Sequence, residues 1–433
     1  MSRLFLTHSP DQQYLLPASP TDWLPSDHLC YWVVDLLSSL DMSGFYKSYS
    51  SDGRGAPAYD PRMLAAVVLY AWLRGVFSSR KIARLCREDL GVRVIVGEHQ
   101  PDFRTFISFR NRHGDVLSSL FQKSVCLCQE AGLVSLLEVA GDGTKIAANA
   151  NKDQSVTYAK ASRQEAQISA AIDELMARSA AEDAAEDALY GPDQPEPSPV
   201  PAELAGHQAR RDKLREAQKA LKARAAAQAV AYKERHENQP PEHRSHRKPL
   251  ADPDQAEPKE DQQYNFVDPD SRIMKRQDGT YIQGYNAQAL VDGEHQIIVG
   301  SLLSNEPNDI QQLCPLIDNC IELTGVVPGR VLADKGYHSL YNLEQIRDRG
   351  ITPCIPPHSR YKTGHLTPDE RETYKRRSAI VEPVFGQLKG NGLMMGFWRF
   401  YRRGMPKCRQ DWSLLCAVHN FRKLFTLAPA ITA

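Results

Sequence analysis

Two apolar runs in this chain of 433 residues each lead into an aspartate. The run "LLEVAG" leads into Asp142, and "VLA" leads into Asp334. Apolar runs this short indicate buried strands, and ligands of α/β sheets collect where such strands end, because the strand fixes the position of a carboxylate that reaches solvent. The pattern therefore predicts that both strands end at these acids and that the acids meet on one edge of a sheet. The alternative for either aspartate taken alone is a turn former or a helix cap.

A third acid, Glu382, interrupts the apolar stretch "SAIVEPVFGQLK". The apolar residues around it recur at helical spacing, so the stretch is predicted to pack on the sheet as a helix. A carboxylate in such a place is costly to bury without a partner. Three carboxylates without a His or Cys at ligand spacing suit Mg²⁺, and two such ions roughly 3.5–4 Å apart support displacement at phosphorus. Alternatively, Glu382 pairs with Arg377 or Lys389.

Strand-like segments flank a long polar insertion. Before it stands "LLEVAGDGTKIA", and after it stand "YIQGYNAQALV", "HQIIVGSLL", "RVLADKG" and "ITPCIP", with a helix expected over about 309–323. Strands that alternate with helices in this way predict an α/β domain with a mixed sheet, assembled from residues 121–155 and 263–433.

The segment 156–262 between these pieces has a different composition. Its two Ala-rich, charged stretches are separated by the proline-rich "GPDQPEPSPVP" and consist of good helix formers. They predict an antiparallel helical pair or a coiled coil followed by a linker, without the apolar stripe that a buried helix needs. We therefore expect a helical, mobile attachment that contacts another protein or clamps DNA.

Residues 1–120 are predicted to form an all-α domain. Three helices are expected between residues 59 and 113, with start signals at Asp60 followed by Pro61, at Ser78 or Ser79, and at Asp102. Helices joined by short turns, with an arginine-rich third helix, suit a helix-turn-helix-like unit that binds DNA. The alternative is a packing helix whose arginines are solvated. The candidate DNA-binding residues of this helix are Arg104, Arg110 and Arg112.

The charges balance overall but not locally. The chain holds 53 basic and 53 acidic residues, whereas residues 371–423 hold twelve basic and three acidic residues. This asymmetry indicates a polyanionic partner. Trp398, Phe400 and Tyr401 are interleaved with arginines in the same segment, which suits stacking on DNA, although core packing is the alternative. No apolar run is long enough to span a membrane, and the Pro, Asp and His residues scattered through the first thirty positions do not suit a secretory signal, so we expect a cytoplasmic protein. The nine scattered cysteines are expected to be reduced core residues.

Several motifs, taken in their order along the chain, give it a family likeness. "YDPRMLAAVVLYAWLRGVFSSRKIARLCREDL" and "PDFRTFISFRNRH" form a helical N-terminal region, and "GDGTKI", "GYNAQALVDGEHQIIVG", "VLADKGYHS" and "YKRRSAIVEPVFGQLK" follow. This series resembles the DDE transposases of bacterial insertion sequences, whose catalytic domain has the ribonuclease H fold. The last four resemble the first Asp motif, the hairpin after it, the second Asp motif, and the Tyr-Arg-Glu-Lys signature around the catalytic Glu.

The resemblance implies a catalytic triad that binds two Mg²⁺ ions, or Mn²⁺ in their place. Its members are Asp142, Asp334 and Glu382. Tyr374, Arg377 and Lys389 match the remaining signature positions and would contact DNA. The signature has three residues between its Arg and its Glu, whereas four separate Arg377 from Glu382 here. The six residues between Glu382 and Lys389 agree with the signature.

The implied substrate is double-stranded DNA, both the terminal inverted repeats of the element and the target. The implied reaction cleaves phosphodiester bonds at the element ends and transfers the freed 3′-hydroxyl strand into target DNA. A homodimer or larger synaptic complex would perform it in the bacterial cytoplasm. Two other functions stay open: a ribonuclease H-like nuclease without strand transfer, and a catalytically silent DNA-binding protein descended from a transposase.

Overall fold

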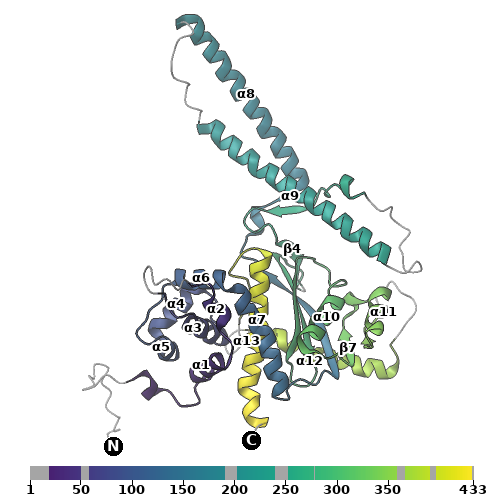
Figure 1. Cartoon of the computed structure of the whole chain (residues 1–433). Helices are drawn as coiled ribbons and strands as arrows, with labels where there is room; N and C mark the ends of the chain where they lie inside the picture. Colours follow the sequence, from purple (N-terminus) through teal and green to yellow (C-terminus); the bar gives the residue numbers. More distant parts are fainter. Residues whose placement is uncertain are drawn as a thin grey trace, which may run out of the picture.

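The computed structural model describes residues 19–49, 58–190, 202–238, 252–276, 278–357, 366–390 and 396–431. Figure 1 shows a group of helices near the N-terminus, a sheet with its own helices, and a long helical hairpin that projects away from both. The helices α7 (Gly114–Glu130) and α13 (Met405–Ile431) pack together between the first two parts. No helix within the described ranges is long and apolar enough to cross a lipid bilayer.

The N-terminal part is helical, as the sequence predicts. The carboxylate of Asp60 accepts the backbone N–H of Arg62, and that of Asp102 accepts the backbone N–H of Arg104, so both predicted caps are confirmed. A third predicted start is found at Ser79. The boundary expected at residue 120 lies inside α7. The other helices of this part are α1 (Leu29–Ser39), α2 (Ser43–Tyr46), α3 (Pro61–Leu73), α4 (Ser79–Glu88), α5 (Leu90–Val96) and α6 (Phe103–Arg112).

A mixed sheet forms the centre of the second part. Its strands are β1 (Glu138–Ala147), β4 (Arg272–Lys275), β5 (Tyr281–Asp292), β6 (Ile298–Ser304), β7 (Arg330–Ala333) and β8 (Thr352–Cys354). β5 lies antiparallel to β1, β4 and β6, whereas β7 lies parallel to β1 and to β8. The order β6-β5-β1-β7-β8, with three antiparallel strands followed by two parallel ones, is that of a ribonuclease H-like domain. The expected fold class is confirmed.

Helices cover both faces of this sheet. Successive side chains of a strand point to opposite faces, so neighbouring residues of β1 and β7 enter different cores. Val139 and Val331 belong to one core with α10 (Leu313–Thr324) and α11 (Leu340–Asp348). Ala140 and Leu332 belong to the other, with α12 (Pro368–Lys389), α13 and the N-terminal helices. The helical N-terminal part and the sheet therefore share one continuous core.

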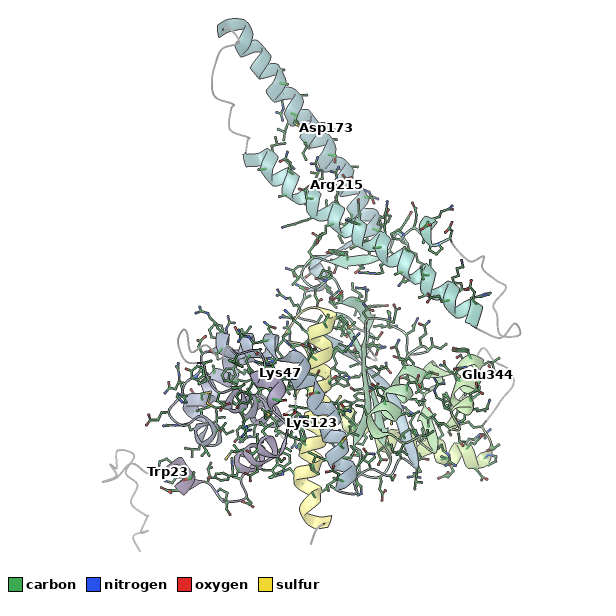
Figure 2. All side chains as sticks on the ribbon, viewed as in Figure 1. Trp23, Lys47, Lys123, Asp173, Arg215 and Glu344 are labelled. Atoms are coloured by element: carbon green, nitrogen blue, oxygen red, sulfur yellow. The ribbon has the colours of Figure 1, made fainter. Side chains whose placement is uncertain are left out.

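The insertion forms an antiparallel hairpin of α8 (Tyr158–Tyr190) and α9 (Ala202–Asn238). Figure 2 shows Asp173 on α8 and Arg215 on α9, both on the part of the hairpin that projects from the body. The expectation that no apolar stripe joins these helices is wrong near their base, where Ile168 and Ile172 are buried with Leu214 and Leu221. The proline-rich break 191–201 and residues 239–251 of the expected linker lie outside the described residues.

Two short strands join the hairpin to the sheet domain. β2 (Ser155–Thr157) immediately precedes α8, and β3 (Gln263–Asn265) follows α9 and a 3₁₀ turn. They pair antiparallel, with Val156 opposite Tyr264. The chain therefore enters and leaves the insertion at adjacent positions.

Candidate active site

The register of β1 and β7 brings the first two candidate acids together. Gly141 of β1 pairs with Ala333 of β7 in the last parallel pair, and Asp142 and Asp334 are the residues that follow them. Parallel neighbours lie about 4.8 Å apart, so the two acids start from adjacent backbone positions. The prediction that the first strand ends at Asp142 is wrong, because β1 continues to Ala147 against β5. It is the pairing with β7 that ends there.

The Asp142 carboxylate is partly buried, with 21% of its side chain exposed. Its Oδ1 accepts the backbone N–H of Gly143 at 2.7 Å, and its Oδ2 accepts Arg377 Nη1 at 3.1 Å. Burial raises the pKa of Asp142, and the nearby Asp334 charge adds to this, while Arg377 and the Gly143 N–H oppose it. Burial and a neighbouring carboxylate both disfavour a second negative charge here. The pair is therefore suited to share a cation.

Asp334 has a second, structural role. Its Oδ1 accepts the backbone N–H of Gly336 at 2.8 Å and caps the 3₁₀ turn Lys335–Tyr337. The helix-cap alternative that the sequence left open is therefore seen together with the proximity to Asp142.

Glu382 lies on α12, across Arg377 from the two aspartates. Arg377 Nη2 is 3.8 Å from a Glu382 carboxylate oxygen, and the Glu382 side chain is 62% exposed. Pro383 follows within the helix and cannot donate to Ala379 O, which instead accepts Gln296 Nε2 at 3.1 Å. The guanidinium of Arg377 thus lies between Asp142 and Glu382 and pairs with both.

The other signature residues also face this region. Arg377 lies over the ring of Tyr374, with 5.9 Å between its guanidinium carbon and the ring centre. Burial lowers the pKa of Arg377, but Asp142 and other neighbours outweigh it, so the net pKa is raised. Lys389 Nζ hydrogen-bonds Thr144 Oγ1 on β1. Burial lowers the pKa of Lys389 to about 8, and Arg276 contributes in the same direction.

A cleft of about 440 Å³ with charges of both signs is lined by Asp142, Thr144, Asp334 and Lys389, but not by Tyr374, Arg377 or Glu382. Its described acids are Asp142, Asp278, Asp309 and Asp334, and its described cations are Lys145, Lys275, Arg276 and Lys389. Sequence reasoning missed Asp309, which it placed only at the start of a helix. Asp309 Oδ1 accepts hydrogen bonds from Asn286 at 2.7 Å, Gln288 at 2.8 Å and Lys145 at 3.2 Å. The short loop between β6 and α10 carries it to the sheet.

A buried hydrogen-bond chain supports both aspartate-bearing segments. The hydroxyl of Tyr337, in the turn after Asp334, donates to Gln288 Oε1 on β5. Gln288 Nε2 donates in turn to Asp309. Gly143 lies against these groups, because a Cβ there would be 2.3 Å from Gln288 Nε2 and 2.9 Å from Asp309 Oδ1. A side chain at this position would displace the support of the site.

The donor set fits a hard cation in its chemistry. Asp142 and Asp334 supply adjacent carboxylate oxygens, which Mg²⁺ and Mn²⁺ prefer. The positive charge between Asp142 and Glu382 is that of the Arg377 guanidinium, which pairs with both carboxylates. Within the described ranges, no group of three or more His, Cys, Asp or Glu side chains is spaced to hold a metal ion. Asp142 and Asp334 therefore follow paired strand residues and line one cleft, and Glu382 is linked to Asp142 through Arg377.

The three arginines of α6 have different surroundings. Arg104 is exposed and lies over the Phe103 ring, and Arg112 is exposed and lies over the Tyr49 ring. Arg110 is only 2% exposed, and its Nη2 donates to Asp411 Oδ1 on α13 at 2.8 Å. The expectation that all three form one surface does not hold for Arg110, which points into the core between the helices and the sheet domain.

The aromatic residues of the C-terminal segment are similarly divided. Phe400 is completely buried, in agreement with the core-packing alternative. Trp398 and Tyr401 are 47% and 40% exposed, respectively. Trp398 lines the cleft that holds Asp142 and Asp334.

Adjacent acids on the middle strands of a β6-β5-β1-β7-β8 sheet, joined to a helical N-terminal part, define a ribonuclease H-like catalytic domain with a helical accessory domain. Two family models match the chain: a transposase domain (DUF772) over residues 19–112 and a transposase DDE domain over residues 245–421. The chain belongs to the DDE transposases of insertion sequences. Asp142 and most of the insertion lie outside both matched segments.

Membership of this family defines the general chemistry. DDE transposases act on DNA, and they generally use divalent metal ions. The searches of curated proteins and of solved structures gave no match.

Proposed function

We propose that this protein binds the ends of its own mobile element, cleaves phosphodiester bonds there, and joins the freed 3′ hydroxyl to target DNA. The observation that carries the proposal is the register of β1 and β7, which puts Asp142 and Asp334 side by side at the cleft. An acid pair held by two buried strands is rigid, as a site for in-line displacement requires.

Asp142, Asp334 and Glu382 would hold the Mg²⁺ or Mn²⁺ ions. When bound, a metal pair supplies an activated nucleophile and neutralises the leaving oxygen. Arg377 keeps Asp142 and Glu382 compensated in the free protein and would turn to a DNA phosphate once a cation takes its place. Lys389, whose amine is fixed by Thr144, would contact a second phosphate beside it.

DNA outside the cleft would contact Arg104 and Arg112, the exposed arginines of α6, and Tyr374 would support Arg377. Joining two element ends requires two active sites, so we propose a homodimer or larger assembly on DNA. A cytoplasmic location suits the nine cysteines, all of which are free thiols.

The decisive experiment replaces Glu382 with Gln. Glu382→Gln keeps the size of the side chain but removes the charge that a divalent ion needs, so nicking and strand transfer should fall by orders of magnitude while DNA binding persists. Glu372→Gln is the matched control, because Glu372 lies on the same helix, is exposed and pairs with Lys375. Nicking at the wild-type rate by Glu382→Gln would remove Glu382 from the triad.

The same assay separates the alternative functions. A transposase gives a joined product between an element end and target DNA, whereas a nuclease gives nicks alone. A wild-type protein that binds DNA but neither nicks nor joins it with Mg²⁺ or Mn²⁺ would be the silent, transposase-derived protein.

A further inference from the structure

A second cleft, of about 720 Å³, lies between the N-terminal helices and the segment that precedes α13. Its walls come from the start of α4, from α6, from Asn149 after β1, and from residues 401–407. Five basic residues line it, and none of its described lining residues is acidic. They are Arg80, Arg110, Arg402, Arg403 and Lys407. This composition differs from that of the active-site cleft, where acids and bases alternate.

The floor of the second cleft carries an uncompensated positive charge. Asp411 Oδ1 accepts Arg110 Nη2 at 2.8 Å and Arg402 Nη2 and Nε at 2.8 and 3.0 Å. One carboxylate therefore serves two guanidiniums that are almost fully buried. Within the described part of the chain, neither the buried Nε of Arg110 nor the second carboxylate oxygen of Asp411 has a hydrogen-bond partner, and the Arg110 guanidinium lies over the Trp72 ring. A buried excess of positive charge is costly unless an anion offsets it.

The rim adds three exposed cations to this floor. Arg80 and Lys407 are exposed, and so is Arg403, whose Nε donates to Asn149 O at 3.0 Å. Low-dielectric walls focus the field of such charges into the cleft and raise the local concentration of anions. A linear polyanion in the cleft would contact the three rim side chains and lie above the positively charged floor.

The two clefts are connected by one short stretch of chain. Trp398 lines the active-site cleft, and Tyr401 lines the basic cleft. The segment between them runs beside the end of β1, with Ala147 N donating to Trp398 O and Phe400 N donating to Ala147 O. Three residues span at most about 11 Å, so Trp398 and Tyr401, and with them the adjoining walls of the two clefts, are separated by no more than about three nucleotides of one strand at a rise of 3.4 Å.

We infer that the basic cleft binds backbone phosphates of the DNA strand that enters the active site. This inference rests on the proposed function, and it assigns the cleft between the helical and catalytic domains as a phosphate site. Guanidinium and ammonium groups suit phosphate oxygens, and a contact to phosphates carries no sequence information. It ties the orientation of the N-terminal helices to the position of the scissile phosphate.

The first test measures the salt dependence of DNA binding by the full-length protein, using fluorescence anisotropy of a short labelled duplex. The test variant is Arg80→Ala/Arg403→Ala/Lys407→Ala, which leaves the Arg110–Asp411–Arg402 floor intact. Arg84→Ala is the matched control, because Arg84 is an exposed arginine of α4 that pairs with Glu88 and does not line the cleft. Thermal unfolding checks that all variants remain folded.

Each lost phosphate contact should lower the slope of log affinity against log salt by about 0.9, so the triple variant should lose roughly 3 in slope. The control should keep the wild-type slope. If wild type and control bind DNA and the triple variant binds with the same affinity and slope, the basic cleft is not a phosphate site. If wild type binds no DNA at any salt concentration, the proposed function itself fails.

The second test locates the contact along the strand, once the cleaved bond has been mapped. A single neutral methylphosphonate is moved stepwise away from that bond in otherwise identical duplexes. At one or more positions within several nucleotides of that bond, neutralisation should weaken binding by wild type and leave the triple variant unaffected. Equal losses for both proteins at every position would place the strand outside the cleft.

Discussion

Replacing Asp411 measures how much its shared carboxylate, which accepts from Arg110 of α6 and from Arg402, stabilises the contact between the helical and catalytic domains. Asp411→Asn keeps the shape of the side chain and removes its charge. It leaves Arg110 and Arg402 buried without an anion. The three hydrogen bonds at 2.8–3.0 Å run from charged guanidinium groups to the charged carboxylate. The neutral amide oxygen of Asn would accept each of them more weakly.

Breaking a buried ion pair by removing one partner costs about 3–5 kcal/mol. In a cooperative unit of 150–250 residues, each kcal/mol lowers the melting temperature by about 2–4 °C, so a loss of roughly 6–20 °C is expected. Differential scanning fluorimetry at fixed ionic strength measures this shift. The matched control is Asp318→Asn, since Asp318 makes two similar bonds to Arg349 but is 52% exposed.

An exposed pair contributes about 0–1 kcal/mol, so the control should change the melting temperature by only a few degrees. Equal, small shifts for both variants would show that water reaches the Asp411 site. The floor of the basic cleft would then carry no buried excess of positive charge. A larger loss of melting temperature for Asp411→Asn that is partly reversed by adding DNA would support both the buried charge at Asp411 and DNA binding in the basic cleft.

Further outcomes follow from the active-site region and from the helical hairpin. Lys389 has a pKa of about 8 in the folded protein, below its usual 10.5, so the unfolded chain holds more protons between these values and stability should rise with pH across that window. DNA affinity should fall as pH passes 8 and the amine loses its charge, and Lys389→Arg should abolish this fall in binding titrations; a fall that persists in the variant would assign it to another group. Gly143→Ala forces Gln288 and Asp309 to move, so nicking should drop by about 10²-fold in a single-turnover assay, and an unchanged rate would show that the support is not needed. Replacing residues 158–262 with a tight turn between β2 and β3 should leave the melting transition of the sheet domain intact by calorimetry, and loss of that transition would make the hairpin part of the core.

Local chemistry made much of the fold predictable from the sequence. Asp60 and Asp102 could be identified as caps because a cap involves residues two or three positions away. The strands that carry Asp142 and Asp334 could be identified because short apolar runs between polar residues indicate buried strands. The helical spacing around Glu382 likewise predicted a helix that packs on the sheet, where Ile380, Val381, Val384 and Leu388 are buried and Phe385 is partly buried.

Contacts between distant segments were not predictable in this way. Arg110 and Asp411 are 301 residues apart, and nothing near Arg110 in the sequence distinguishes it from the exposed Arg104 and Arg112. Asp309 lies in a loop, where its sequence context suggests only a helix start. Its partners Lys145 and Gln288 come from different strands. Such residues could be found from one sequence only if the register of those strands were already known.

Because β2 and β3 pair at the base of the insertion, the length of the insertion does not affect the geometry of the active site. Ser155 lies opposite Asn265, so the chain leaves and rejoins the domain one strand spacing apart, whatever number of residues lies between. Helical turns can then be gained or lost from α8 and α9 without moving β1 or β5. The hairpin is thus a region in which evolution can change the reach of the protein while the catalytic geometry stays constant.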